Sequence, residues 1–398
     1  MTVRKLQPTL KPRSLADLIY EPKTRGLILQ VLLVSALLLL GYEIVTNTIA
    51  NLRKQGIASG FTFLGRTAGF DISQSVVEYK NTMSYGRVFL VGLWNTILVS
   101  VLGIVFATIL GFIIGIARLS TNWIVAACAT VYVEIVRNLP LLLQLFGWYF
   151  AVMMALPRAT ESRLLPFGAM LNRRGLYLPA PVSEPGMSWV WTALLIGIIA
   201  AFVVAAWARR RRLATGHLFP VVPVSLALVI GLPLLTFLVT GQPLSFDQPH
   251  PGRYNVEGGM AILPELAALL VGLTVYTAAF IAEIVRSGLA GVPRGQREAA
   301  SALGLSAWQS LRLVVIPQAM RIIIPPLTNQ YLNLTKNSSL AVAIGYPDLV
   351  SVFAGTVLNQ TGQAVEVILI TMGVYLALSL LTSLGMNWFN ARMALVER

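Results

Sequence analysis

Charged side chains and cysteine are scarce in this chain, and each scarcity excludes a class of protein. Only 12% of the 398 residues are Asp, Glu, Lys or Arg, whereas a soluble globular domain carries about 25%. The 56% of hydrophobic residues and the mean hydropathy of +0.73 indicate several membrane spans instead. The single cysteine, Cys128, excludes an internal disulfide and a cysteine-rich zinc site, and its apolar surroundings predict a small packed core residue.

Residues of catalytic and nucleotide sites are scarce as well. The two histidines, His217 and His250, fall in predicted loops and the acidic residues are scattered, which argues against a membrane enzyme. The sequence contains no glycine-rich phosphate loop ending in Gly-Lys-Ser/Thr, so the chain is not expected to bind ATP itself. The net charge is +14, and the basic residues flank apolar runs. This distribution is typical of the loops that set the orientation of membrane spans, and not of a nucleic-acid-binding domain.

Long apolar runs dominate what is present. A membrane-spanning helix needs about 20 predominantly apolar residues. The predicted spans are 27–45, 88–117, 122–156, 188–208, 218–240, 262–285, 319–337 and 363–388, which makes eight. The chain is therefore predicted to be an all-α, polytopic membrane helical bundle. The first run is longer than the apolar core of a signal peptide, so we favour an uncleaved anchor over a cleaved signal.

Two stretches do not fit a regular span. The stretch 122–156 is too long for one simple crossing and contains Pro140, which lacks a backbone donor and clashes with the preceding helical turn. We expect a bent or broken helix there, with its second part reaching the outer face. The stretch Ser338–Gln360 is interrupted by Gly345-Tyr346-Pro347-Asp348, so we expect a short outer-face helix or a re-entrant piece.

The basic residues predict the orientation. Eight spans place both termini on the same side of the membrane. A cytoplasmic N-terminus puts most of the Lys and Arg residues inside, including those before residue 27, the run Arg209–Arg212 and the loop 286–318. Because cytoplasmic loops are enriched in Lys and Arg, we predict cytoplasmic N- and C-termini.

One polar loop between two apolar spans carries the most specific pattern of the chain. Its residues are Glu298, Ala299, Ala300, Gly304, Val314, Ile316 and Pro317. The pattern predicts a helix, a glycine bend and a second helix that proline stops. It resembles the cytoplasmic loop of the inner-membrane permease subunits of bacterial ABC importers. An ordinary cytoplasmic amphipathic loop is the alternative.

The resemblance extends to the segments on both sides of this loop. Those that look like the polar-amino-acid branch of these permeases are Tyr132–Phe146, Tyr276–Arg286, Val292–Gln296, Pro317–Arg321, Pro325-Pro326 and Lys336–Leu340. That family has a five-span core, so this chain carries an added N-terminal span and an insert with two more. The extended form resembles the general L-amino-acid permeases, whose substrates include glutamate, glutamine, aspartate and asparagine.

The resemblance implies a domain organisation. Its expected parts are a cytoplasmic segment 1–26, the added span 27–45, a first core part 88–156, the insert 157–261, and a second core part 262–390 with the coupling loop 286–318. The outer segment of the insert is rich in Pro and Arg and is expected to be loop, while its two spans form a peripheral hairpin. Lipid-facing padding and contact with a partner are both left open as roles for this insert.

The resemblance also implies partners. In that family the loop docks on a separate ATPase, which forms a dimer and binds ATP and Mg, so no cofactor and no metal are expected in this chain. The residues carried over as ATPase-coupling are Glu298, Ala299, Ala300, Gly304 and Pro317. Glu298 is expected near a helix start, where the helix dipole favours a carboxylate; simple capping is the alternative. The other expected partners are a periplasmic amino-acid-binding protein, membrane lipids and a second homologous permease, as a heterodimer with a homodimer as the alternative.

The span 319–337 is unusually polar. Asn329, Asn333, Lys336 and Asn337 follow helical spacing and share one face. Polar groups within a bilayer usually face the bundle interior or a water-filled cavity. The face is a candidate for the translocation path, and contact with the partner permease is left open.

Two pairs of opposite charges are spaced three residues apart, so each pair shares a helical face. For Glu134 and Arg137 we favour a mutual ion pair before Pro140, and contact with the ammonium and carboxylate of an amino acid is the alternative that makes them path candidates. Glu283 and Arg286 are expected to form a similar clamp beside the coupling loop.

An ion-gradient-driven secondary amino-acid transporter is the competing function. It would share the spans and the polar faces, but it needs no ATPase-docking loop, and two halves of inverted topology are often visible in such proteins. The sequence favours the permease subunit. Specificity is expected to reside largely in the external receptor.

Overall fold

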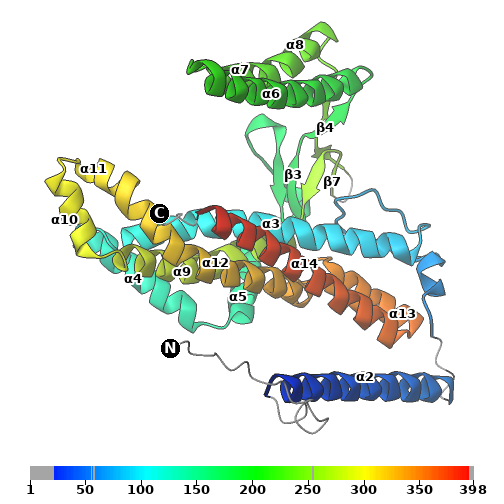
Figure 1. Cartoon of the computed structure of the whole chain (residues 1–398). Helices are drawn as coiled ribbons and strands as arrows, with labels where there is room; N and C mark the ends of the chain where they lie inside the picture. Colours follow the sequence, from blue (N-terminus) through cyan, green and yellow to red (C-terminus); the bar gives the residue numbers. More distant parts are fainter. Residues whose placement is uncertain (1–21, 55, 57–58, 253–254, 394–398) are drawn as a thin grey trace, which may run out of the picture.

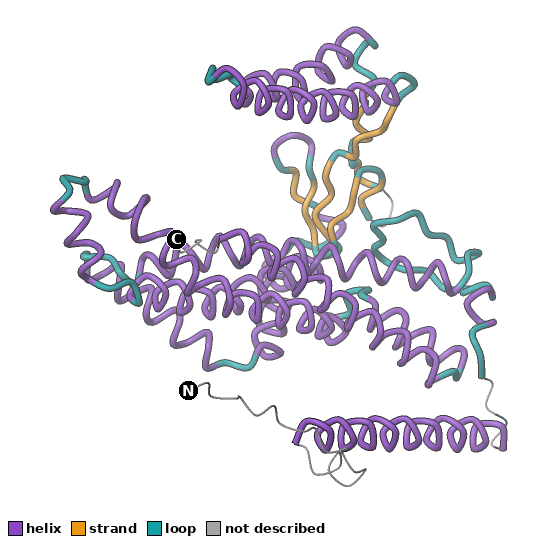
Figure 2. Tube along the Cα trace, viewed as in Figure 1, coloured by secondary structure: helices purple, strands orange, loops and turns teal. Residues whose placement is uncertain are grey.

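The computed structural model describes residues 22–54, 56, 59–252 and 255–393. The expected segment 1–26 therefore lies almost wholly outside the described residues. Within the described part the chain is mostly helical, with a small β-structure in the insert (Figure 2). The predicted all-α membrane bundle is confirmed.

Seven helices of the described residues are long and apolar enough to cross a membrane. They span Arg25–Asn51, Tyr85–Ala117, Met187–Thr215, Val221–Val239, Pro264–Ala290, Ala307–Ile344 and Ala364–Arg392. One further crossing is available if the bent pair Trp123–Asn138 and Leu141–Ala155 counts as one span. These crossings coincide with the stretches that the sequence predicts.

Four helices form the central bundle (Figure 1). They are α3 (Tyr85–Ala117), α9 (Pro264–Ala290), α12 (Ile316–Asn337) and α14 (Ala364–Met393). Glycines allow α3 and α9 to approach closely, because a Cβ added at Gly111 would lie 2.6 Å from the Cβ of Ile281 and one at Gly115 would lie 2.7 Å from that of Val285. In turn, α12 packs against both α9 and α14.

The stretch 122–156 is a broken helix, as predicted. Helix α4 (Trp123–Asn138) and helix α5 (Leu141–Ala155) meet at 108° on either side of Pro140. The Gln144 amide donates to the carbonyls of Val136, at 2.8 Å, and Leu139, at 3.0 Å, and so satisfies acceptors that the break releases. Cys128 on α4 is exposed, so the predicted core role is wrong, because α4 buries only the side that carries Ala129, Val133 and Val136.

The segment after α12 is irregular, as predicted. A 3-10 helix η6 (Ser338–Ile344) ends at Gly345, which has φ 78°, and after a short break the chain continues as a π-helix η7 (Val350–Val357) and helix α13 (Leu358–Thr361). The segment before α3 covers this region. Its 3-10 helix η1 (Thr62–Gly65) buries Phe63 fully against Phe353, and the backbone N–H of Gly60 donates to Glu366 at 2.5 Å.

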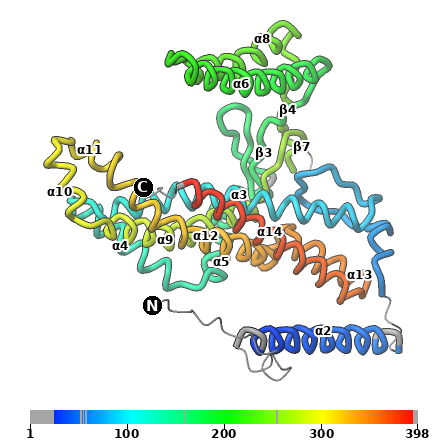
Figure 3. Tube along the Cα trace, in the orientation of Figure 1, coloured from blue at the N-terminus to red at the C-terminus, as the bar shows by residue number. Residues whose placement is uncertain are grey.

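Helices of the added segments lie apart from the bundle (Figure 3). Helix α2 (Pro22–Lys54) lies on one side, and the hairpin of α6 (Met187–Thr215), α7 (Val221–Leu226), η4 (Ala227–Gly231) and α8 (Leu232–Val239) lies on the other. Helix α6 packs against the returning helices α7 and α8. The predicted peripheral hairpin is therefore present.

The outer segment of the insert is folded, so its assignment as loop is wrong. An antiparallel sheet contains, in this order, β1 (Arg163–Leu164), β2 (Met170–Asn172), β3 (Gly175–Leu178) and β8 (Met260–Ile262). Two further pairs are β4 (Ala180–Ser183) with β5 (Leu244–Asp247), and β6 (His250–Pro251) with β7 (Val256–Glu257). Short 3-10 turns occupy Ala159–Glu161 and Pro166–Gly168. Pro181 on β4 and Pro251 on β6 lie in two-stranded sheets, where every strand is an edge and the missing N–H is tolerated.

Candidate functional site

A helical hairpin projects from the bundle at the end where α9 stops (Figure 1). It consists of α10 (Arg294–Ala302), α11 (Ala307–Ser310) and a π-turn η5 (Leu311–Val315). Gly304 makes the bend with φ 75°, in the left-handed region that favours glycine. The N–H of Leu305 closes the end of α10 on the carbonyl of Ala300 at 3.1 Å, and the side chains of Ser306 and Gln309 form a capping box at the start of α11. The predicted glycine bend is confirmed.

Pro317 does not stop the second helix, so that part of the prediction is wrong. The chain passes from η5 into α12, and Pro317 occupies the first turn of α12. Proline has no N–H to donate, and the wider hydrogen-bond spacing of a π-turn directly before it accommodates the missing donor. The hairpin is therefore joined to the polar helix α12 without a loop.

The residues of the Glu-Ala-Ala pattern lie along α10. Helix α10 begins at Arg294, so Glu298 is its fifth residue and lies past the first turn, and the expected position near the helix start is wrong. The interaction of Glu298 with the helix dipole is correspondingly weak, because this effect falls off within the first turn. Ala300 is buried against the rest of the hairpin, whereas Glu298 and Ala299 are exposed. The exposed pair is free to contact another subunit.

A cluster of three charges joins α3 to α9 directly before the hairpin. The Glu283 carboxylate accepts hydrogen bonds from Arg286, at 2.5 Å from Nη2, and from Arg118 at the end of α3. The Arg118 side chain is only 9% exposed. The predicted Glu283–Arg286 clamp is confirmed. The spacing of charges along the sequence does not predict the contact of Arg118, because Arg118 is far from Glu283 along the chain.

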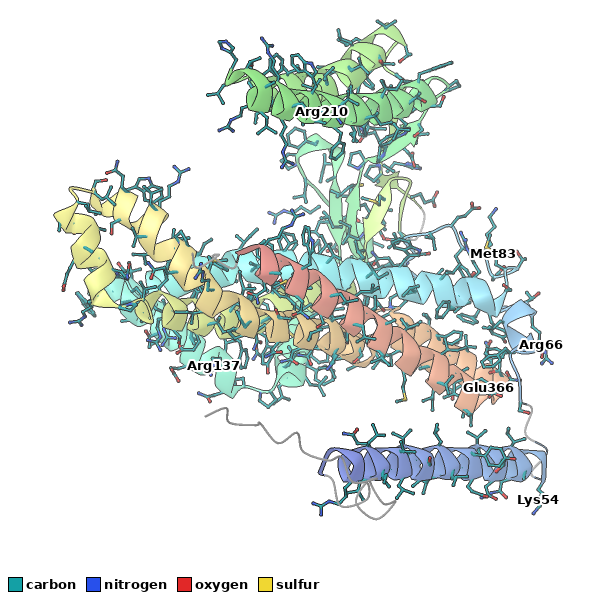
Figure 4. All side chains as sticks on the ribbon, viewed as in Figure 1. Lys54, Arg66, Met83, Arg137, Arg210 and Glu366 are labelled. Atoms are coloured by element: carbon teal, nitrogen blue, oxygen red, sulfur yellow. The ribbon has the colours of Figure 1, made fainter. Side chains whose placement is uncertain are left out.

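The pair on α4 behaves differently. Both Glu134 and Arg137 are described and exposed, yet no ion pair joins them, so the favoured interpretation is wrong. The Arg137 guanidinium lies 5.2 Å from the ring centre of Phe280 on α9, and Figure 4 shows it at the edge of the bundle. This cation–π contact replaces the expected carboxylate.

Helix α12 presents its polar face as predicted. Asn329, Asn333 and Lys336 are exposed, and Asn337 is half-buried. Facing Asn329, helix α14 contributes Ser383, Asn387 and Asn390 to a cavity of about 230 Å³. The α12 candidates share one face, whereas α4 packs against α9, so the structure does not gather all six path candidates in one place. The amides of α14 were missed because they lie in a separate, mainly apolar span.

A buried polar joint holds the irregular segment after α12, and sequence reasoning missed it too. The Asn95 amide on α3 donates to the carbonyl of Pro347 at 2.8 Å, and the Tyr375 hydroxyl on α14 donates to Asp348 at 3.3 Å. Asp348 lies in the break outside the spans, is 1% exposed, and accepts the N–H of Ser351 at 2.8 Å. Burial raises the pKa of its carboxyl to about 7, although the hydrogen bond from Ser351 opposes the shift.

The sequence of the chain matches a known protein family. Residues 193–395 match the family described as "Binding-protein-dependent transport system inner membrane component". The chain belongs to this family. It is therefore a multi-span permease component of a binding-protein-dependent transport system, and the ion-gradient-driven alternative is set aside.

Relatives of this permease cover nearly its whole length. The general L-amino acid transport system permease protein AapQ of Rhizobium johnstonii is 54% identical over 385 residues, which are 97% of this chain and 96% of AapQ. The putative amino-acid ABC transporter permease protein YhdX of Escherichia coli is 51% identical over 95% of this chain and 96% of YhdX. A solved amino acid ABC transporter with histidines is 20% identical, with a TM-score of 0.46, over 77% of this permease and 95% of that chain.

Proposed function

We propose that this permease moves polar or general L-amino acids from the periplasm to the cytoplasm, as part of an ATP-driven importer. Glutamate, glutamine, aspartate and asparagine are the proposed substrates. The similarity along almost the whole chain to permeases named for amino acids supports this proposal. BztB of Rhodobacter capsulatus, a permease protein of a glutamate/glutamine/aspartate/asparagine transport system, is 39% identical over 96% of this chain.

The α10–α11 hairpin is the proposed docking site of a separate ATPase dimer that binds ATP and Mg. Its exposed Glu298 and Ala299 would contact the ATPase. The buried Ala300 and the bend at Gly304 would keep the hairpin compact, and Pro317 would join the hairpin to α12. A continuous helical connection from η5 into α12 supports this role, because a displacement of the hairpin would reach the polar face of α12 directly.

A cytoplasmic position of the hairpin and of both termini is proposed with it. Helix α2 starts, and helices α3, α6 and α14 end, toward the side of the hairpin, whereas Figure 4 labels Lys54, Arg66, Met83 and Glu366 at the opposite side. The hairpin side also carries Arg118 and the run Arg209–Arg212. The positive-inside rule favours this side as the cytoplasmic one. The separation of helices α6 to α8 from the bundle supports the proposed core parts 88–156 and 262–390 around the insert 157–261.

The translocation path is proposed along the exposed face of α12, with Asn329, Asn333, Lys336 and Asn337. Polar side chains within a bilayer need water or protein partners, and in this chain Asn329 and Asn333 are exposed. A second, homologous permease, paired as a heterodimer, would cover that face. Glu134 and Arg137 on α4 are proposed as accessory path residues, supported by their lack of a mutual ion pair.

ATP hydrolysis by the reconstituted importer tests the proposed function. The permease is co-purified with its ATPase, inserted in nanodiscs, and assayed with a periplasmic binding protein loaded with each candidate amino acid. Stimulation of hydrolysis by loaded binding protein is expected. Transport that continues when ATP is absent and an ion gradient is supplied would contradict the proposal.

The double substitution Asn329→Leu and Asn333→Leu separates the two roles of the α12 face. A path predicts slower uptake by an intact heterodimer, whereas a pinning role predicts loss of the second permease during purification. Gln330→Leu on the same helix, outside this polar face, is the control.

A further inference from the structure

A large cavity lies between the α10–α11 hairpin and the ends of helices α3 and α9. Its volume is about 870 Å³, within the range of about 300–1,000 Å³ that small-molecule sites occupy. Ile116 from the end of α3 and Leu289 from the end of α9 line it on the bundle side, and Val125 of α4 closes another wall. Since α3 and α9 both stop here, the cavity lies at the level where the membrane meets water.

The lining of the cavity is mostly apolar and contains two basic side chains. Aliphatic side chains of the hairpin, including Leu311 and Val315, face those of the spans across the cavity. Arg294 and Arg297 of α10 line it as well, and both are exposed. No Asp or Glu is among the described lining residues, so the two positive charges are not neutralised within the cavity.

Most of the N–H donors of the Arg294 and Arg297 guanidinium groups have no acceptor among the described residues. The Arg297 side chain gives one hydrogen bond, from Nη2 to the carbonyl of Leu289 at 3.3 Å, and the Arg294 side chain makes no hydrogen bond or ion pair with any described residue. A guanidinium presents several donors in a fixed fork that matches a phosphate oxygen pair. Two such groups above an apolar cavity suit a ligand with an anionic head and an aliphatic tail.

We propose that this cavity binds an acidic phospholipid of the adjacent leaflet, with its phosphate on Arg294 and Arg297 and an acyl chain against Ile116, Val125 and Leu289. Basic pockets between membrane helices bind such headgroups, and buried methylenes add apolar contact area. The lipid would fill the space between the hairpin and the α3–α4 turn. It would thereby stiffen the hairpin against the bundle and make its movement depend on the composition of the membrane.

Native mass spectrometry of the assembled transporter tests the site. The complex is delipidated and titrated with phosphatidylglycerol and, separately, with phosphatidylcholine. The double variant Arg294→Gln with Arg297→Gln is expected to lose at least about tenfold in affinity for phosphatidylglycerol, since charge-assisted hydrogen bonds contribute more than one factor of ten. Binding of phosphatidylcholine should not change.

Two further variants keep the test decisive if the double variant assembles poorly. Arg312→Gln removes a charge from the same hairpin outside the cavity lining and should bind phosphatidylglycerol normally. Ser301→Phe fills the cavity without changing charge and should lose phosphatidylglycerol. Equal phosphatidylglycerol affinity in all variants would overturn the proposal, as would displacement of the lipid by inorganic phosphate alone. Loss of the ATPase from the double variant with lipid binding unchanged would overturn it too, because the arginines would then serve that subunit.

Discussion

Helices α9 and α2 are both apolar, yet they have opposite surroundings. In the most apolar stretch of α9, 56% of the residues are buried within the chain, whereas the corresponding stretch of α2 has none buried. Helix α9 carries small residues such as Ala278, Ala279 and Gly288 at its contacts, which lets neighbouring helices approach closely. Helix α2 carries large leucines that remain exposed. Hydrophobicity alone therefore identifies a span, and the distribution of small residues distinguishes a core span from a peripheral one.

Glycine substitutions should separate the two kinds of span most strongly. Gly111→Val on α3 should destabilise the bundle by about 1–3 kcal/mol or more, since its Cβ would meet Ile281 at 2.6 Å. Gly41→Val on α2 should have almost no effect, because nothing lies within 4 Å of the added Cβ. Thermal unfolding of the two purified variants in detergent gives the comparison. Equal losses in both would break the distinction between core and peripheral spans.

Gly304→Val should disable the hairpin while the bundle stays folded. A β-branched residue at φ 75° costs about 1–3 kcal/mol and distorts the bend. We expect uptake to fall at least about tenfold while ATP hydrolysis persists, because hydrolysis by the ATPase would no longer drive movement of substrate through the translocation path. Gly216→Val is the matched control, because Gly216 follows α6 outside this hairpin, has φ 74°, and has nothing within 4 Å of an added Cβ. Normal uptake by Gly304→Val would refute the proposed coupling role.

Removing a carboxylate should also lower the stability of the bundle more than that of the peripheral helix α2, by a smaller margin. Glu283→Gln leaves Arg118, which is 9% exposed, without its carboxylate, and should destabilise the bundle by about 2 kcal/mol. Arg286 contributes less, because it is 36% exposed and solvent screens its charge. Glu43→Gln on the exposed α2 should be neutral. The melting temperatures of both variants check this, and a neutral Glu283→Gln would rule out a stabilising role for the cluster.

Asp348→Asn should change how the stability of the bundle depends on pH. The pKa of Asp348 is raised from 3.8 to about 7, so the folded state keeps its proton where the unfolded state has lost it. Stability should therefore fall as pH rises from about 4 to about 7 and level off above that range. Asp348→Asn should flatten this part of the profile of melting temperature against pH. An unchanged slope would mean that another group titrates there.

The sequence predicted the spans well because each one is a long apolar run, and Pro140 marked the break between α4 and α5. It did not predict the β-structure of the insert. Its strands are short, and partners such as Leu176 and Ile262 or Ala180 and Asp247 are separated by the α6–α8 hairpin. Local periodicity carries no signal for such pairings.

The candidate site was predictable only where its residues are close in sequence. The spacing of Glu283 and Arg286 predicted their ion pair, and Gly304 predicted the bend. Spacing misled for Glu134 and Arg137, because Phe280 on another helix competes for the guanidinium. The contacts of Arg118 and Asp348 arise from tertiary packing and left no pattern in the sequence.

Labelling of a single cysteine tests whether the α10–α11 hairpin meets an ATPase in the cytoplasm. In a Cys128→Ser background, Glu298→Cys places one thiol on the exposed face of α10. We expect a membrane-impermeant maleimide to react with it only in inside-out vesicles, and added ATPase to protect it. Labelling of intact cells from outside, or a thiol that no aqueous reagent reaches in either orientation, would contradict docking of the α10–α11 hairpin on a cytoplasmic ATPase.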